Sequence, residues 1–329
     1  TALREEGALN AGGGRTLGRP EDHGLAPARR PFLRVPAKGH DWAIHQSGRL
    51  IDRSTQAWVR ATGTIIEFAA EPWLLGPSGG TEVVADDWLP IEAKRLGGIV
   101  AEGRGLVDHF DRLNGPGFNA AQLASPIIQF YERTAEWRLE AWSQWSPVAW
   151  PFGWMLSALF ARRLQQLSLP LRPIEVAQGM DSRVLAVVAP DGSQVGSAWL
   201  RRLRSTGQNV YSGWYGIVQL PNTDRPSIRV MFPLPNGSVA VFLRPDVRDD
   251  GALVLTSPLG RFGDDGAYLI VSRAGTSSAS VRRVPLVERF VVWVDDEGTL
   301  RADHELNLWR VPVLRFHYRL DHRGTPVGR

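Results

Sequence analysis

The spacing of apolar residues changes once along this chain, at about Pro170. Between Ala120 and Leu169 the apolar residues recur at helical spacing, whereas beyond Arg172 short runs of Val, Ile, Leu and aromatic residues alternate with turn formers. We therefore expect an α+β protein, in which a Trp-rich helix pair over 120–170 packs against an antiparallel sheet over 171–323.

The first predicted helix lies in the sequence PIIQFYERTAEWRLEAW. At about 100° per residue, apolar side chains gather on one face and glutamates form a stripe on the other, as in an amphipathic helix. The apolar face holds Ile127, Ile128, Tyr131, Ala135, Leu139 and Trp142, and the stripe holds Glu132, Glu136 and Glu140.

A second helix is predicted from about Phe152 to Leu167, after a break between Ser146 and Pro151. Proline lacks a backbone donor and disfavours helix in the residue before it, which explains the break. The apolar face of this helix would carry Phe152, Leu156, Leu159, Phe160, Leu164 and Leu167.

The C-terminal half contains five triplets that end in glycine, which supplies the positive φ of a tight turn. No long helical pattern separates them, so we expect roughly nine or ten antiparallel strands in a barrel or a strongly curved sheet. The triplets are Pro190-Asp191-Gly192, Pro235-Asn236-Gly237, Asp249-Asp250-Gly251, Asp264-Asp265-Gly266 and Asp296-Glu297-Gly298.

The N-terminal part shows weaker patterns. Residues 1–40 carry a glycine triplet and several prolines, which predicts a flexible or wrapping arm. Residues 41–119 are expected to form an irregular α/β lead-in, with strand-like content at 58–68 and one or two helical turns at 88–96. Residues 324–329 would form a tail.

Tryptophan is concentrated in one block, since five of the 13 tryptophans lie between Trp137 and Trp154. Large rigid aromatic side chains at this density favour the wall of an apolar ligand site. We expect the lining to include Trp142, Trp145, Trp150 and Trp154, together with aromatic residues of the sheet. The sheet candidates are Trp214 and Tyr215, which lie between glycines in GWYG, and Phe316 or Tyr318.

Two arginines fall in the middle of the predicted apolar helix faces, Arg138 on the first and Arg163 on the second. Burying a guanidinium is costly unless an anion or a set of carbonyls pairs with it. Two interpretations stay open: each arginine reaches an edge or pairs with a structural carboxylate, or it anchors an anionic ligand group beneath the tryptophans.

The last predicted strand, VLRFHYRL, alternates in character. Leu314, Phe316, Tyr318 and Leu320 share one face, whereas Arg315, His317 and Arg319 share the other. If the interior is apolar, the second face is the solvent side. If the interior holds a polar ligand, His317 becomes the candidate catalytic base, because its unperturbed pKa lies near neutrality.

Composition narrows the chemistry. The chain has no cysteine, which removes disulfides, thiolate nucleophiles and Cys-ligated metal sites. No metal-ligand or cofactor motif is found, so we expect neither a metal nor a cofactor. The sequence Gly76-Pro77-Ser78-Gly79-Gly80 formally fits a nucleophile elbow, but the residues around it do not suggest a strand before it and a helix after it, so we read it as a plain loop.

Charge and hydropathy bear on partners and location. The net charge is +4, but the cations are spread along the chain and 36 of the 38 are arginine, so nucleic-acid binding is not expected. The apolar run from about Pro147 to Phe160 is shorter than the ~20 residues that a membrane-spanning helix needs, although it suits an interfacial contact. With no leader-like start, the expectation is a cytoplasmic protein.

One stretch resembles a known group of proteins. The segment SQWSPVAWPFGWMLSALFARRLQQLSLPL at 143–171 is similar to a stretch in uncharacterised actinobacterial proteins. The resemblance implies no activity and no functional residue.

Two functional hypotheses follow. In the first, the protein binds a sizeable apolar small molecule bearing an acid group, either as a carrier or as a cofactor-independent enzyme such as a cyclase, isomerase or hydrolase. In the second, it is a non-enzymatic interaction protein that docks to a partner or a membrane surface through its tryptophan block.

Overall fold

The computed structural model describes residues 41–79, 87–145, 180–204 and 209–324. Helices are few within these ranges, and about half of the described residues lie in strands. The helices are α1 (Asp41–Thr62), α2 (Trp88–Arg95) and α3 (Ser125–Glu132), with short 3-10 turns η1 (Pro72–Leu74), η2 (Phe110–Leu113), η3 (Ala120–Gln122) and η4 (Thr134–Glu136).

Fourteen strands form one branched sheet in which every pair of strands is antiparallel. They are β1 (Thr64–Glu67), β2 (Ile99–Glu102), β3 (Trp137–Trp145), β4 (Met180–Val188), β5 (Gln194–Leu203), β6 (Asn209–Val218), β7 (Ser227–Leu234), β8 (Gly237–Val247), β9 (Leu253–Ser257), β10 (Gly266–Ser272), β11 (Ser278–Val284), β12 (Leu286–Val294), β13 (Leu300–Leu308) and β14 (Val311–His322).

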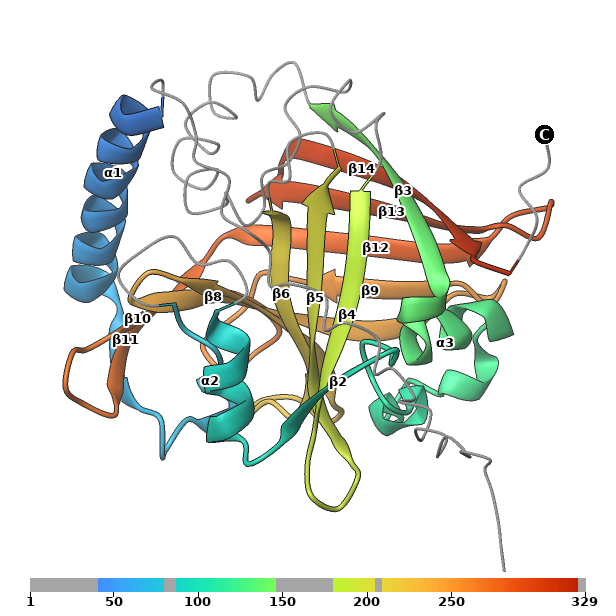
Figure 1. Cartoon of the computed structure of the whole chain (residues 1–329), viewed down its shortest axis with the longest axis horizontal. Helices are drawn as coiled ribbons and strands as arrows, with labels where there is room; N and C mark the ends of the chain where they lie inside the picture. Colours follow the sequence, from blue (N-terminus) through green and yellow to red (C-terminus); the bar gives the residue numbers. More distant parts are fainter. Residues whose placement is uncertain (1–40, 80–86, 146–179, 205–208, 325–329) are drawn as a thin grey trace, which may run out of the picture. The chain divides into compact units, whose positions relative to one another are not determined.

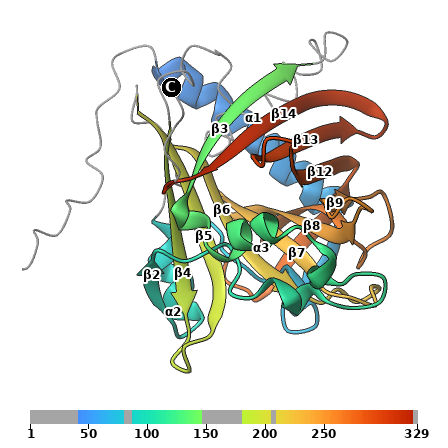
Figure 2. The ribbon, with the colours of Figure 1, turned by 90° about the vertical axis from the view of Figure 1, so that its right-hand side faces the viewer.

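The sheet branches at β8, which pairs with β10 through its first half and with β9 through Arg244–Val247. We call β2-β4-β5-β6-β7-β8-β10-β11-β1 the long leaf and β9-β12-β13-β14-β3 the short leaf. The two leaves cross in Figure 1 and diverge from β8 in Figure 2. The path of paired strands runs from β2 to β3, and among the described strands these two ends do not pair with each other. The sheet is therefore branched and is not closed into a barrel, which was one of the two expectations.

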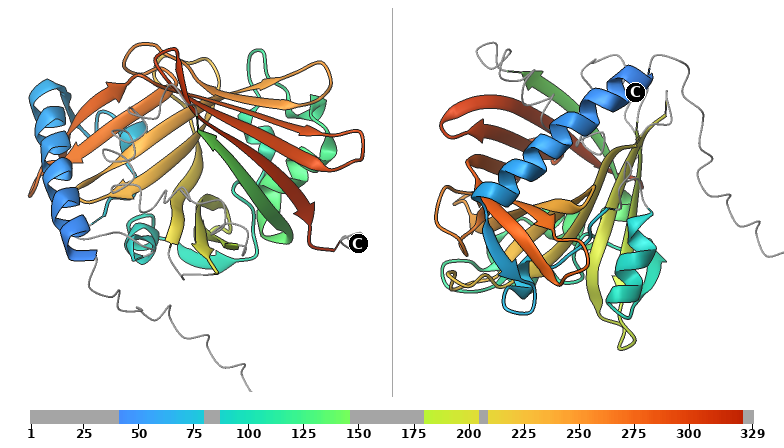
Figure 3. Two further views of the ribbon diagram at one scale, coloured as in Figure 1. Left: turned by 90° about the horizontal axis from the view of Figure 1, so that it is seen from above. Right: turned by 90° about the vertical axis from the view of Figure 1, so that its left-hand side faces the viewer.

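Apolar side chains fill the space between the leaves and form what we call the inner cluster. Trp199 and Phe232 come from the long leaf, Leu255 and Leu320 come from the short leaf, and Phe130 of α3 packs among them. The outer cluster lies on the opposite face of the long leaf, under α2 and η1. It contains Trp73, Trp88, Trp214, Phe242 and Tyr268, while α1 runs along β10 and β11 (Figure 3).

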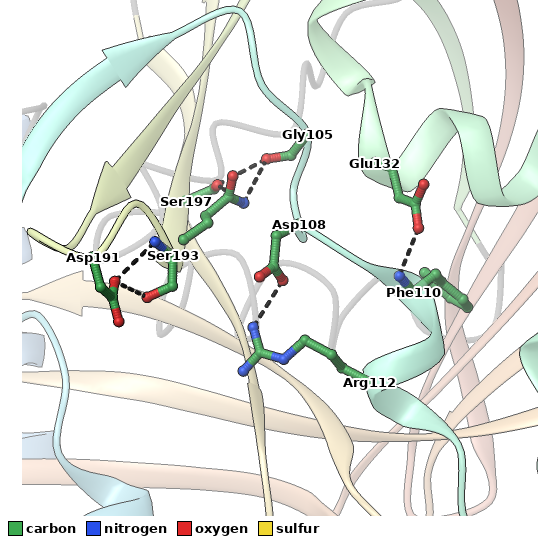
Figure 4. A network of polar contacts seen from close by, with 9 residues as sticks. Gly105, Asp108, Phe110, Arg112, Glu132, Asp191, Ser193 and Ser197 are labelled. Atoms are coloured by element: carbon green, nitrogen blue, oxygen red, sulfur yellow. Dashed lines mark hydrogen bonds and ion pairs between the residues drawn. The ribbon is translucent and has the colours of Figure 1, made fainter.

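A network of polar contacts fastens the segment before α3 to the long leaf (Figure 4). The carbonyl of Gly105 accepts hydrogen bonds from Gln194 Nε2 at 3.1 Å and Ser197 Oγ at 2.8 Å. Glu132 Oε1 accepts from the backbone N–H of Phe110 at 2.7 Å. A Cβ at Gly105 would stand 2.2 Å from the carbonyl oxygen of Tyr131, so only glycine permits this approach.

The structure corrects the first predicted helix. Helix α3 ends at Glu132, and the tryptophan-rich sequence from Trp137 to Trp145 is strand β3, paired along its whole length with β14. The segment also alternates with period two: Trp137 is buried and Leu139 is half-buried, whereas Arg138 and Glu140 are exposed. The segment has helical spacing, but pairing with β14 makes it a strand. The local sequence does not reveal this distant partner.

One other expectation for the first half needs correction, and one is confirmed. The lead-in begins with the 22-residue helix α1, which covers the first part of the strand-like segment 58–68, and only Thr64–Glu67 forms a strand. The helical turns expected at 88–96 are confirmed by α2. The arm at 1–40, the helix expected at 152–167 and the tail at 325–329 lie outside the described residues.

The expectations for the C-terminal half are confirmed in outline. Strands β4 to β14 fill the described part of 180–322, with no helix among them. All five glycine triplets lie at connections between strands or at the first residue of a strand. Turn chemistry therefore located the strands, because a tight turn needs residues that accept its backbone angles.

Candidate ligand-binding site

Between the leaves, one arginine lies among aromatic rings. The guanidinium carbon of Arg201 is 3.8 Å from the ring centroid of Trp199, 5.0 Å from that of Tyr211 and 5.9 Å from that of Tyr318. Tyr215 joins them through a hydrogen bond between its hydroxyl and that of Tyr211. We call these five residues the Arg201 site.

Strand alternation and cross-strand pairing assemble the Arg201 site. Trp199 and Arg201 are two residues apart on β5, so they share a face, and Tyr211 lies directly opposite Arg201 on β6. Tyr318 reaches the same interior from β14 on the short leaf, where the alternation of the strand points Leu314, Phe316 and Leu320 inward as well.

The charge of Arg201 has no carboxylate partner. Among the described residues no Asp or Glu forms an ion pair with it, and its Nε is buried without a hydrogen-bond partner, although the guanidinium forms a side-chain hydrogen bond with Tyr318. Aromatic faces stabilise a cation, with about 0.5–2 kcal/mol for each favourable contact, but they do not satisfy the in-plane N–H groups. The fork of the guanidinium is therefore available to a planar anion such as a carboxylate.

The tyrosines around Arg201 are neutral donors. Burial raises the pKa of Tyr318 to about 12 and raises the pKa values of Tyr211 and Tyr215 further above their usual value. Arg201 opposes the shift at each of these hydroxyls, but burial dominates. At neutral pH the site thus presents one positive charge and several hydroxyl groups.

A carboxylate and an imidazole lie nearby on the short leaf. Glu288 Oε2 is 3.0 Å from His304 Nε2, and each side chain is 12% exposed. The imidazole of His304 stacks on the ring of Phe290 at 3.7 Å. Glu288 is close enough to raise the pKa values of Tyr211 and Tyr318, so this pair belongs to the same interior.

The residues around Arg201 are less deeply buried than the tryptophans at the centre of the outer cluster. Arg201, Tyr211, Tyr215, Tyr318 and Glu288 are all half-buried, whereas Trp88 and Trp214 are fully buried.

The structure places two predicted site residues elsewhere. Arg138 is exposed on β3, so the expectation that it is buried is wrong, because β3 is a strand and its alternation points Arg138 away from the interior. Trp142 lies on the same outward face and is 52% exposed, with its ring 6.1 Å from that of His317.

Trp214 and Tyr215 are neighbours in sequence but lie on opposite faces of β6. Trp214 is fully buried in the outer cluster and packs edge-on against Trp88 at 6.1 Å, whereas Tyr215 belongs to the Arg201 site. Trp142 and Trp214 therefore do not line one site together. Trp150, Trp154 and Arg163 lie outside the described residues, as does the side chain of Trp145.

His317 lies on the outward face of β14, as expected for an apolar interior. Its Nδ1 is 2.7 Å from Asp303 Oδ1, and Arg315 forms an ion pair with the same carboxylate. Burial raises the pKa of Asp303, but the bonds from His317 and Arg315 outweigh it and hold that pKa below its usual value. The imidazole stands outside the Arg201 site, and a catalytic role for it stays a prediction.

Sequence reasoning missed Arg201, Tyr211, Glu288 and His304. A signal was present for Arg201, because Trp199 and Arg201 share one face of the strand QVGSAWLRRL. Within the described ranges no three His, Asp or Glu side chains gather so as to hold a metal ion.

The comparisons with known proteins give one distant relative. The chain is 31% identical over 232 residues to the uncharacterised membrane protein YndJ of Bacillus subtilis (strain 168). The alignment covers 68% of this chain but 39% of YndJ, so the chain spans well under half of that relative's length. No protein-family model matches the chain. No solved structure matches it.

The match corrects the expected location. A relative named as a membrane protein contradicts the expectation of a cytoplasmic protein, which rested on the residues at the start of the chain. In the part of the chain that the structure describes, no helix is long and apolar enough to cross a membrane. The resemblance of residues 143–171 to actinobacterial proteins stays an expectation.

Proposed function

We propose that the space between the two leaves binds a sizeable apolar molecule bearing an acid group, with Arg201 as the anchor for the acid. The observation that carries the proposal is the Arg201 guanidinium, which lies among three aromatic rings with its Nε unsatisfied and no carboxylate paired to it. A cation left in this state is costly unless a ligand completes it.

The surroundings of Arg201 favour an amphiphile over a small polar anion. The inner cluster next to it is apolar, with Val184, Phe232 and Leu320 among its members. Ligand sites of this kind combine a mostly apolar wall with a few polar groups that fix orientation. The hydroxyls of Tyr211 and Tyr318 add neutral donors for the second oxygen of a carboxylate or for phosphate oxygens.

Native mass spectrometry of the purified chain tests this proposal. We expect wild-type protein to carry an acidic amphiphile that remains bound in the gas phase, and Arg201→Met to lose it. The matched control is Arg204→Met, since Arg204 is exposed and paired with Asp181 just beyond the end of the same strand. Wild-type protein that stays ligand-free after exposure to a lipid extract would overturn the proposal.

Glu288 and His304 favour cofactor-free turnover of the ligand as a second candidate function. A carboxylate bonded to an imidazole is a pair that can move a proton, and this one lies in the same interior as Arg201. We expect His304→Gln to retain the bound molecule. If turnover occurs, the mass of the molecule recovered from this variant differs from that recovered from wild type, and identical masses would leave a carrier.

A further inference from the structure

The hairpin between β13 and β14 ends in an unusual turn. Leu308 pairs with Val311, which leaves Trp309 and Arg310 as a two-residue loop. Trp309 has a backbone φ of 53°. Residues other than Gly, Asn and Asp rarely adopt this left-handed conformation. The β7–β8 hairpin also has a two-residue loop, but there the positive φ, 58°, falls on the second loop residue, Asn236, a residue type that adopts it readily.

The backbone of Trp309 is held by a hydrogen bond, but its ring is exposed. The backbone N–H of Trp309 donates to the carbonyl of Pro285 at 2.7 Å, which fixes the turn against the start of β12. The side chain is 61% exposed, and Val311 beside it is 46% exposed. Within the described residues the indole makes no ring contact and no hydrogen bond. The exposed indole therefore adds no packing within the described residues that would offset the backbone strain.

A lipid surface is the partner that fits this turn. Tryptophan is enriched at the boundary between headgroups and hydrocarbon, and Arg310 beside it suits anionic headgroups. Strand β3 also ends near this turn, because Trp145 pairs with Leu314, four residues beyond Arg310. The relative YndJ is named a membrane protein. We propose that the Trp309 turn contacts a lipid bilayer, with the indole in the headgroup region and Arg310 at anionic lipids.

Vesicle co-sedimentation of the full chain tests this proposal, which does not rest on a ligand at Arg201. The key variant is Trp309→Gly, since glycine adopts the observed φ without strain and leaves the turn intact. We expect wild type to bind vesicles that contain phosphatidylglycerol, and Trp309→Gly to bind roughly tenfold more weakly. Its melting temperature should equal or exceed that of wild type, because backbone strain is relieved.

The controls separate lipid contact from general stickiness. Trp58→Ala removes another exposed tryptophan, 43% exposed on α1, and should bind vesicles as wild type does. Arg310→Gln should weaken binding to phosphatidylglycerol vesicles more than to phosphatidylcholine vesicles. Equal binding of wild type and Trp309→Gly, or no vesicle binding by wild type, overturns the proposal.

Discussion

Each face of the long leaf holds a half-buried arginine, and the two arginines differ in their partners. On the outer face, Arg229 of β7 donates from Nη1 to the carbonyl oxygens of Leu75 at 3.0 Å and Trp73 at 3.4 Å. Burial lowers its pKa to about 10. On the inner face, Arg201 lies over aromatic rings, and no carboxylate or backbone carbonyl among the described residues is bonded to it.

The contrast lies in the groups that surround each guanidinium. Nε of both arginines lacks a partner, but Arg229 donates to backbone carbonyls of the segment that covers it, whereas Arg201 has the hydroxyl of Tyr318. On the outer face the indole N–H of Trp88 donates to Ser212 Oγ at 2.9 Å. The outer face thus holds its arginine with backbone carbonyls, whereas the inner face holds its arginine over aromatic rings, and the proposed role of Arg201 rests on this difference.

The largest expected effect is on the outer face. Replacing Trp214 with alanine removes a fully buried indole, and Gly196 beneath the ring cannot fill the space. We expect the free energy of unfolding to fall by about 3–5 kcal/mol in urea titrations. A loss below about 1 kcal/mol would mean that the outer cluster is not the stabilising face.

Arg229→Met should cause the second-largest loss in the free energy of unfolding. The variant leaves the carbonyls of Leu75 and Trp73 without their donor, so we expect a loss of about 2–3 kcal/mol in the same titration. Arg204→Met, an exposed control, should stay within about 0.5 kcal/mol of wild type. If Arg229→Met is neutral, the outer arginine is no more structural than the inner one and the comparison fails.

Arg201→Met should change the free energy of unfolding by about 1 kcal/mol or less without ligand. The lost contacts with Trp199 and Tyr211 are offset by relief of an incompletely satisfied charge. A loss of about 3 kcal/mol or more in ligand-free protein would show that Arg201 is structural, and the inner face would then resemble the outer one.

The smallest expected effect is the dependence of stability on pH through Asp303. Because bonds from His317 and Arg315 hold the pKa of Asp303 below its unfolded value, the carboxylate stabilises the fold above about pH 4. This contribution disappears as pH falls through the lowered pKa of the folded state. We expect Asp303→Asn to cost about 0.5 kcal/mol at pH 7 and progressively less as pH falls below about 4. A cost that is independent of pH would contradict the ion-pair account.

The strands of the C-terminal half could be predicted because residue types in the local sequence mark the turns between them. Asp296-Glu297-Gly298 marks the β12–β13 connection by residue type alone. The turn at Trp309 and Arg310 could not be found in this way, since neither residue is a turn former. Strand β3 was missed because Leu139 and Trp142 fit helical spacing, and its pairing with β14 is some 170 residues away in sequence.

The sequence predicted an arginine among aromatic rings, but at another position. An arginine beneath aromatic rings was expected at Arg138, and the structure has that arrangement at Arg201. The sequence shows that Trp199 and Arg201 share a face of one strand. It does not show that this face meets Tyr318 of the short leaf, because the crossing of the leaves depends on how β8 branches.

Calorimetric titration with two matched probes tests the central claim most directly. Dodecanoate and dodecanol share a chain and differ in their charge, so their affinity ratio reports the contribution of the anchor. We predict that wild type prefers dodecanoate by about tenfold or more and that Arg201→Met loses this preference while still binding dodecanol. A preference that survives in Arg201→Met, or equal affinities in wild type, would contradict an anionic ligand held by Arg201.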